Sequence, residues 1–222
     1  MTQKKRPHHH GNLREALILA GLEIVRSEGP DALTLRKCAL RAGVSHAAPA
    51  HHFNGVTSLR TAIIARGHRI FAQSMRDALA DAANRSATSP KEQVTAICVG
   101  YINFAQTHSA LFKFMFQPHD QDFTKIDAVT SDEIRRDAGR SYEVLRTACH
   151  PLGTTEKERA QVEATIWSMV HGYAMLFGDA NSNLGPPRPD RPESIPAITD
   201  VLANLNWSFL GKNADSKGNS QE

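Results

Sequence analysis

The sequence predicts an all-α protein of about nine helices, with a small N-terminal domain and a larger C-terminal one. Three observations support this fold class. Apolar residues recur at spacings of three and four along most of the chain, no alternating pattern of convincing length indicates a strand, and Gly and Pro separate the periodic stretches. With 222 residues, 41% of them hydrophobic, the chain is long enough for one substantial core or two modest ones.

The first third of the chain is typical of three short helices followed by a long one. Residues 12–28 carry an apolar stripe that ends at Gly29-Pro30. Thr34 is placed to N-cap a second helix, and Gly43 supplies the left-handed residue that ends it. The inward positions of this second helix are Leu35, Cys38, Ala39 and Ala42.

Val44 is expected to fill the turn after the second helix, and Ser45 to N-cap a third helix that closes at Phe53. Two helices joined by so few residues must cross steeply, as in a helix-turn-helix. A long periodic stretch from Thr57 to about Ala83 then predicts the helix that leads into the second domain.

Five more helices are expected in the C-terminal part. Residues 91–116 predict two helices with a break near His108-Ser109, and residues 131–150, 156–178 and 195–209 predict one each. Residues 117–130 and the Pro-rich segment 185–192 are typical of loops. The domains expected from this pattern are 1–56 and 57–211, followed by a polar tail at 212–222.

Charge is distributed unevenly along the chain. Residues 1–69 hold eleven Lys and Arg against four Asp and Glu, whereas residues 70–222 hold fifteen against nineteen. A basic module at the front indicates a polyanionic partner when it coincides with a helix-turn-helix pattern. No apolar run long enough for a transmembrane helix or a signal peptide is present, so we expect a soluble cytoplasmic protein without a membrane partner.

The three cysteines are odd in number and far apart, each within a helical pattern. This arrangement favours reduced thiols packed in the core over a disulfide framework. No glycine-rich phosphate loop, HExxH or CxxC motif and no metal-ligand spacing occurs, so the sequence predicts no enzyme, no cofactor and no metal.

Residues 1 to about 71 resemble the DNA-binding domain of TetR-family transcriptional regulators. Four pieces carry the resemblance in the right order: the lead-in HHHGNLREALILAGLEIVRSEGPDALTLR, the turn AGVS, the aromatic Phe53, and a helix opening at TSL. The later segments FAQTHSALFKFMF and WSMVHG resemble the effector domain of one subgroup of this family, the WHG type.

In a helix-turn-helix, the first turn of the second helix faces base edges in the major groove. That turn offers His46, Ala47 and Ala48, and Arg36 in the preceding helix is the strongest candidate for a base contact because a guanidinium can pair with guanine. Phosphate contacts are expected from the side chains of Thr34, Lys37, Ser45, His51 and His52, and from backbone N–H groups at Thr57. The arm Lys4, Lys5 and Arg6 either follows a groove or is a solvated tail.

Two positions depart from the family pattern. Where the family usually has a Tyr and a Lys that contact phosphates, this chain has Ala50 and Val56. Loss of both contacts would weaken DNA binding by roughly 1–3 kcal/mol if nothing compensates.

The resemblance also implies a small-molecule pocket in the C-terminal domain and a homodimer. The sequence offers as pocket residues Tyr101, Phe104, Phe112, Met115, Trp167, His171 and Met175. A stripe of this kind is more often plain core, and a satisfied structural histidine at His171 is the alternative. The expected dimer interface comprises Val170, Tyr173, Phe177, Ile198, Leu202, Leu205 and Phe209.

These patterns together predict a DNA-binding transcriptional regulator, a ligand-responsive repressor that acts as a homodimer on an approximately palindromic double-stranded DNA operator. The effector is an unknown small molecule. One alternative is a dimer of the same fold that binds a ligand or partner and has lost specific DNA recognition, as Ala50 and Val56 suggest. A small helical enzyme that uses the cavity is a second alternative.

Overall fold

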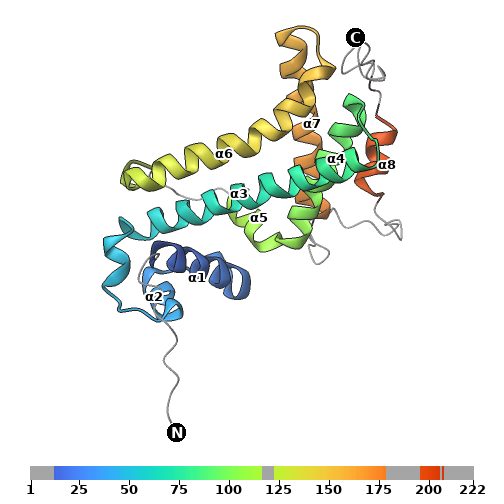
Figure 1. Cartoon of the computed structure of the whole chain (residues 1–222). Coiled ribbons are helices and arrows are strands. Elements are labelled where there is room, and N and C mark those ends of the chain that lie inside the picture. Colours follow the sequence, from blue (N-terminus) through green and yellow to red (C-terminus); the bar gives the residue numbers. More distant parts are fainter. Residues whose placement is uncertain (1–12, 117–122, 179–195, 206, 208–222) are drawn as a thin grey trace.

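The computed structural model describes residues 13–116, 123–178, 196–205 and 207 (Figure 1). In these ranges the chain is all-α, with eight α-helices, four short 3₁₀ helices and no strand. The predicted fold class is confirmed, and the helix count is close to the expected nine. The arm at residues 4–6, the Pro-rich segment and the polar tail lie outside the described residues.

The head consists of α1 (Leu13–Glu28), α2 (Leu35–Ala42) and the 3₁₀ helix η2 (Ala48–His51). The predicted ends of α2 are confirmed. The Thr34 side chain accepts a hydrogen bond from the Lys37 backbone N–H at 3.1 Å, and Gly43 has φ 71°. Cys38 and Ala39 are buried against α1, and Phe53, which follows η2, is also buried.

The third expected helix does not form as an α-helix, which corrects the assignment of Ser45 as its N-cap. Its place is taken by successive tight turns, in which Ala48 donates to Ser45 O at 3.1 Å and His52 donates to Pro49 O at 2.9 Å. Pro49 explains the difference. It has no N–H to donate to Ser45 O, and its ring clashes with the carbonyl four residues back.

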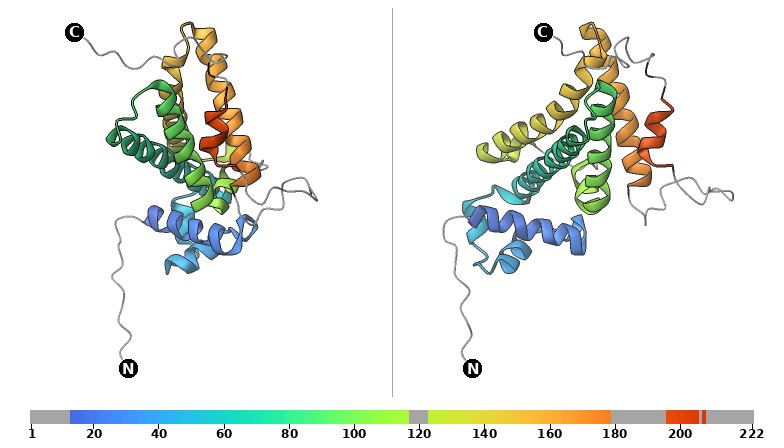
Figure 2. Two further views of the ribbon diagram at one scale, coloured as in Figure 1. Left: turned by 90° about the vertical axis from the view of Figure 1, so that its right-hand side faces the viewer. Right: turned by 45° about the vertical axis from the view of Figure 1, so that its right-hand side comes forward.

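The body begins with α3 (Gly55–Asn84), a helix of 30 residues that runs out of the head (Figure 1). It starts two residues before the predicted Thr57, at Gly55, whose φ of 84° suits glycine. Next to it lies α6 (Ala128–Cys149), which runs in the same direction (Figures 1 and 2). Asp127 caps α6 by accepting from the Thr130 N–H at 2.9 Å, so this helix starts before the expected Ser131.

The remaining helices pack around α3 and α6, and the second of them also contacts α1 of the head. They are α4 (Pro90–Thr107), α5 (Ser109–Phe116), α7 (Glu156–Phe177) and α8 (Ile198–Ala203). The predicted break between α4 and α5 occurs at His108. Gly100 sits where α4 crosses α3, and a Cβ there would come within 2.6 Å of Ser74 O, so the two backbones are in close contact.

One apolar core runs through head and body, and all three cysteines are buried free thiols within it. Burial raises the pKa of Cys38 to about 11 and that of Cys149 to about 12, which keeps both thiols protonated at neutral pH. No helix in the described ranges is both long and apolar enough to cross a bilayer.

Candidate nucleic-acid interface and ligand cavity

The head presents all the residues predicted to contact DNA at its surface. The side chains of Arg36, His46 and His51 are exposed, and none of the others is buried. Arg36 makes no ion pair with any described residue, so its guanidinium is available. Ala50 in the head and Val56 at the start of α3, the two departures from the family pattern, are both exposed.

Lys37 is engaged within the head. Its Nζ lies 2.9 Å from Glu28 Oε2, and Arg41 Nη2 lies 2.7 Å from the other oxygen of the same carboxylate. A phosphate would have to replace Glu28 as the partner of Lys37. Exposed pairs of this kind are weak, about 0–1 kcal/mol, so such an exchange costs little.

A cavity of about 490 Å³ lies in the body between α3, α4, α5, α6 and α7. Its volume is in the range of small-molecule sites. Most of its wall is apolar or aromatic, and the lining residues are His68, Phe71, Met75, Tyr101, Phe116, Ala138, Gly139, Ser141, Tyr142, Leu145 and Trp167.

Of the predicted pocket residues, Tyr101 and Trp167 line this cavity. Phe104, Phe112 and Met115 are buried and pack in the core beside it. His171 and Met175, both on α7, are not in the lining, although His171 contacts the lining residue Tyr101. Helical periodicity marked the inward side of α4 and α7, but nothing in the sequence showed which inward side chains meet empty space.

Sequence reasoning missed Phe116 of α5 and the contributions of α3 and α6 to the cavity. His68, Phe71 and Met75 come from α3, and Ser141 and Tyr142 come from α6. His68 was the available signal, because a histidine within an apolar helical stripe needs a polar partner.

Two histidines beside the cavity are neutral. Burial lowers the pKa of His68 to about 4, although the Asp137 carboxylate opposes the shift. Burial also lowers the pKa of His171, whose Nδ1 lies 2.7 Å from the Tyr101 hydroxyl. Since neutral His171 can accept at Nδ1, we assign the Tyr101 O–H as the donor, and this histidine therefore has a protein partner.

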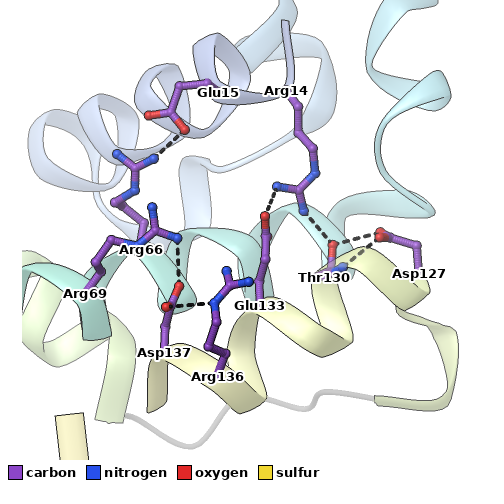
Figure 3. Close-up of polar contacts among 9 residues, drawn as sticks. All are labelled: Arg14, Glu15, Arg66, Arg69, Asp127, Thr130, Glu133, Arg136 and Asp137. Carbon is purple, nitrogen blue, oxygen red and sulfur yellow. Dashed lines mark hydrogen bonds and ion pairs between the residues drawn. The ribbon is translucent and has the colours of Figure 1, made fainter. Parts of the chain in front are cut away.

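Helix α6 connects the cavity wall to the head. Near its start, Glu133 Oε1 lies 2.8 Å from Arg14 Nη1 of α1, and Arg14 Nη2 donates to Thr130 Oγ1 at 2.9 Å (Figure 3). Further along, α6 contributes Ser141 and Tyr142 to the cavity. The same helix therefore contacts the head and any molecule in the cavity.

Other contacts fix α1, α3 and α6 relative to one another. Arg66 of α3 pairs with Glu15 of α1, and Arg69 Nη2 lies 2.8 Å from Asp137 Oδ2 of α6 (Figure 3). Asp137 has a side chain only 1% exposed. Burial alone would raise its pKa, but hydrogen bonds from Arg69 and Arg136 outweigh burial and lower the pKa, so the carboxylate stays charged.

The predicted dimer interface is only partly compatible with the structure. Val170, Ile198 and Leu202 are buried within the single chain, so their side chains already pack in its own core. Tyr173, Phe177 and Leu205 are half-buried, and Phe209 lies outside the described residues. Leu176, which was not predicted, is a large apolar side chain left 42% exposed on α7.

Comparison with known proteins identifies the family. Residues 94–201 match the family model described as the tetracyclin repressor-like C-terminal domain. None of the curated proteins matches the chain. A protein of unknown function from Rhodococcus sp. RHA1 shares the fold with 21% identity and a TM-score of 0.63, over 95% of this chain and 100% of that one.

The TetR family transcriptional regulator PfmR from Thermus thermophilus also shares the fold, with 15% identity and a TM-score of 0.54 over 98% of this chain and 100% of its own. At such identities these likenesses concern the fold alone. The matched C-terminal domain, together with the shared all-α fold, supports a TetR-family transcriptional regulator.

Proposed function

We propose that this regulator is a ligand-responsive repressor that binds an approximately palindromic operator as a homodimer. The observation that carries the proposal is the position of α6, which lines the cavity with Ser141 and Tyr142 and holds the head through Glu133 and Thr130. A ligand that shifts α6 therefore acts on the contacts that set the position of the head.

The mechanism is thermodynamic linkage between the two sites. A ligand that prefers the arrangement of heads that does not fit the operator lowers operator affinity. The effect cannot exceed the ligand's own preference between the two arrangements. Conversely, operator DNA must lower the affinity for that ligand by the same factor, which is a quantitative check on the mechanism.

Dimerisation is proposed through the part of α7 that its own chain leaves uncovered. Leu176 is exposed, and Tyr173 and Met169 lie one and two turns earlier on the same side, both half-buried. A second copy of the chain would cover this stripe. Two heads related by a two-fold axis would then read two half-sites about one helical turn apart.

DNA binding is tested by fluorescence anisotropy at two salt concentrations. The DNA upstream of the protein's own gene is compared with scrambled DNA of equal length. We expect the upstream DNA to bind more tightly and its affinity to fall steeply with salt, since phosphate contacts release counterions. Equal weak binding to both DNAs, or binding that salt does not change, would contradict the proposal.

The alternative is a TetR-fold dimer that binds a ligand or partner but has weakened DNA recognition. The exposed positions Ala50 and Val56 favour it, since the small apolar side chains there offer no hydrogen bond to a phosphate. Under this alternative, the double substitution Ala50→Tyr and Val56→Lys raises DNA affinity by about 1–3 kcal/mol, or roughly 5- to 150-fold. An unchanged affinity would leave the repressor as the better interpretation. The control is Leu40→Lys, which adds a positive charge at another exposed apolar position of the head.

A further inference from the structure

The wall of the cavity carries no net charge. None of its lining residues is Lys, Arg, Asp or Glu, and its histidine, His68, is neutral at pH 7. The charged groups nearby are engaged elsewhere, since Arg69 and Asp137 pair with each other outside the lining. An ion placed against the buried inner wall at Phe71, Met75 and Tyr101 would have no partner there, so this part of the cavity discriminates against charged ligands.

The polar groups of the wall are mostly engaged within the protein. The Tyr142 hydroxyl donates to Glu163 Oε2 at 2.6 Å, and the Tyr101 hydroxyl contacts His171 Nδ1 at 2.7 Å. These hydroxyls cannot donate to a ligand without giving up their present partners.

His68 differs, because its neighbours determine which ring nitrogen carries the proton. The Ser141 hydroxyl donates its proton to Ala138 O at 2.9 Å, one turn back in α6. Its oxygen therefore accepts from His68 Nδ1, which lies 2.9 Å away. In the neutral ring Nδ1 then holds the proton and Nε2 is an acceptor. Nε2 has no hydrogen-bond partner in the described part of the chain.

We propose that the cavity binds an uncharged, largely aromatic or alicyclic molecule that donates one hydrogen bond to Nε2 of His68. This rests on the proposed ligand response and specifies its chemistry. The aromatic wall supplies apolar contact, with the ring of Phe71 edge-on to that of Tyr101 at 4.6 Å between centroids. His68 supplies selectivity, because a ligand without a hydrogen-bond donor leaves the Nε2 atom of His68 without a partner.

The proposal is tested by isothermal titration calorimetry on the full-length protein at pH 7.5, without DNA. Three probes of equal skeleton are compared: 4-benzylphenol, its methyl ether 4-benzylanisole, and 4-benzylbenzoate. We expect the phenol to bind about 3- to 10-fold more tightly than the ether. The carboxylate should bind at least about 100-fold more weakly than the phenol.

Three variants locate the selectivity. His68→Phe removes the acceptor and should bring phenol and ether to equal affinity. Ser141→Ala frees the ring to carry its proton on Nε2, so the preference for the phenol should shrink. His108→Phe makes the same replacement at the break between α4 and α5, outside the lining of the cavity, and should leave the preference unchanged. If His68→Phe fails to fold, the ratio of phenol affinity to ether affinity in the wild type and in Ser141→Ala still tests the proposal.

Three results overturn the inference: no binding of any probe, equal affinity of phenol and ether for the wild type, or a phenol preference that survives His68→Phe. The DNA response is measured separately by anisotropy with saturating 4-benzylphenol. Selective binding that leaves DNA affinity unchanged supports the chemistry of the cavity and counts against the proposed ligand response. Failure of the proposed ligand chemistry and failure of the proposed function therefore give different results.

Discussion

Glu133→Gln removes the carboxylate that holds Arg14 across the boundary between head and body. The two side chains are only 20% and 18% exposed, and their atoms lie 2.8 Å apart, so solvent screens this ion pair weakly. Hydrogen bonds between charged groups in such surroundings contribute about 1.5–3 kcal/mol. Because Gln can still accept one weaker bond and Arg14 keeps its bond to Thr130, we expect a loss of about 1–2 kcal/mol in the free energy of unfolding.

The neighbouring carboxylate provides a matched control. Asp132 pairs with Arg135 at 3.2 Å on the same helix, but these side chains are 73% and 76% exposed. Asp132→Asn should therefore cost no more than about 0.5 kcal/mol. Urea unfolding followed by far-UV circular dichroism, at one protein concentration because the protein is a proposed dimer, measures both variants.

A double-mutant cycle isolates the contact itself. If the pair acts as described, Arg14→Gln and Glu133→Gln together cost about 1 kcal/mol less than the sum of the two single losses. Strict additivity, or equal losses from Glu133→Gln and Asp132→Asn, would refute the conclusion that this contact ties the head to α6.

Three further predictions concern packing, pH and assembly. Gly100→Ala forces a methyl group to within 2.7 Å of the Met75 Cα, so thermal unfolding should show a loss of about 2 kcal/mol or more, whereas Gly139→Ala, with open space around its Cβ, should be neutral or gain up to about 1 kcal/mol. His68 is neutral in the folded chain with a pKa of about 4, and the unfolded chain takes up a proton nearer pH 6.5. Stability should therefore fall as the pH drops from about 6.5 to 4, by at most about 1.4 kcal/mol per pH unit, and His68→Phe should flatten this dependence in urea titrations. Leu176→Glu should dissociate the proposed dimer in sedimentation velocity, while Leu40→Glu, an equally apolar exposed site on α2, should leave it intact; a dimeric Leu176→Glu would place the interface elsewhere.

The ends of α2 could be predicted from the sequence because they depend on local chemistry. Thr34 and Gly43 act through hydrogen bonds and backbone angles within a few residues, and both were identified correctly. Pro49 shows the limit of a pattern. The residues around it match a helix-turn-helix, yet its missing N–H and its ring replace the expected α-helix by single 3₁₀ turns.

The cavity could not be predicted in the same way. Phe104 and Phe71 both occupy inward positions of apolar helices, but Phe104 is enclosed by other side chains and Phe71 lies on the cavity wall. Which of the two meets empty space depends on how α3, α4 and α6 cross. The angles at which these helices cross are set by close contacts such as that at Gly100. Such contacts arise only when segments that are distant in the sequence pack together.

The unbroken length of α3 has a mechanical consequence. With 30 residues it is about 45 Å long, with the head at its start, α6 beside it, and its fixed far end packed against α4. A tilt of about 5° at the fixed end moves the head by about 4 Å, slightly more than the spacing of about 3.4 Å between successive base pairs. In a symmetric dimer the same tilt of both α3 helices would change the distance between the two heads by about two base-pair spacings.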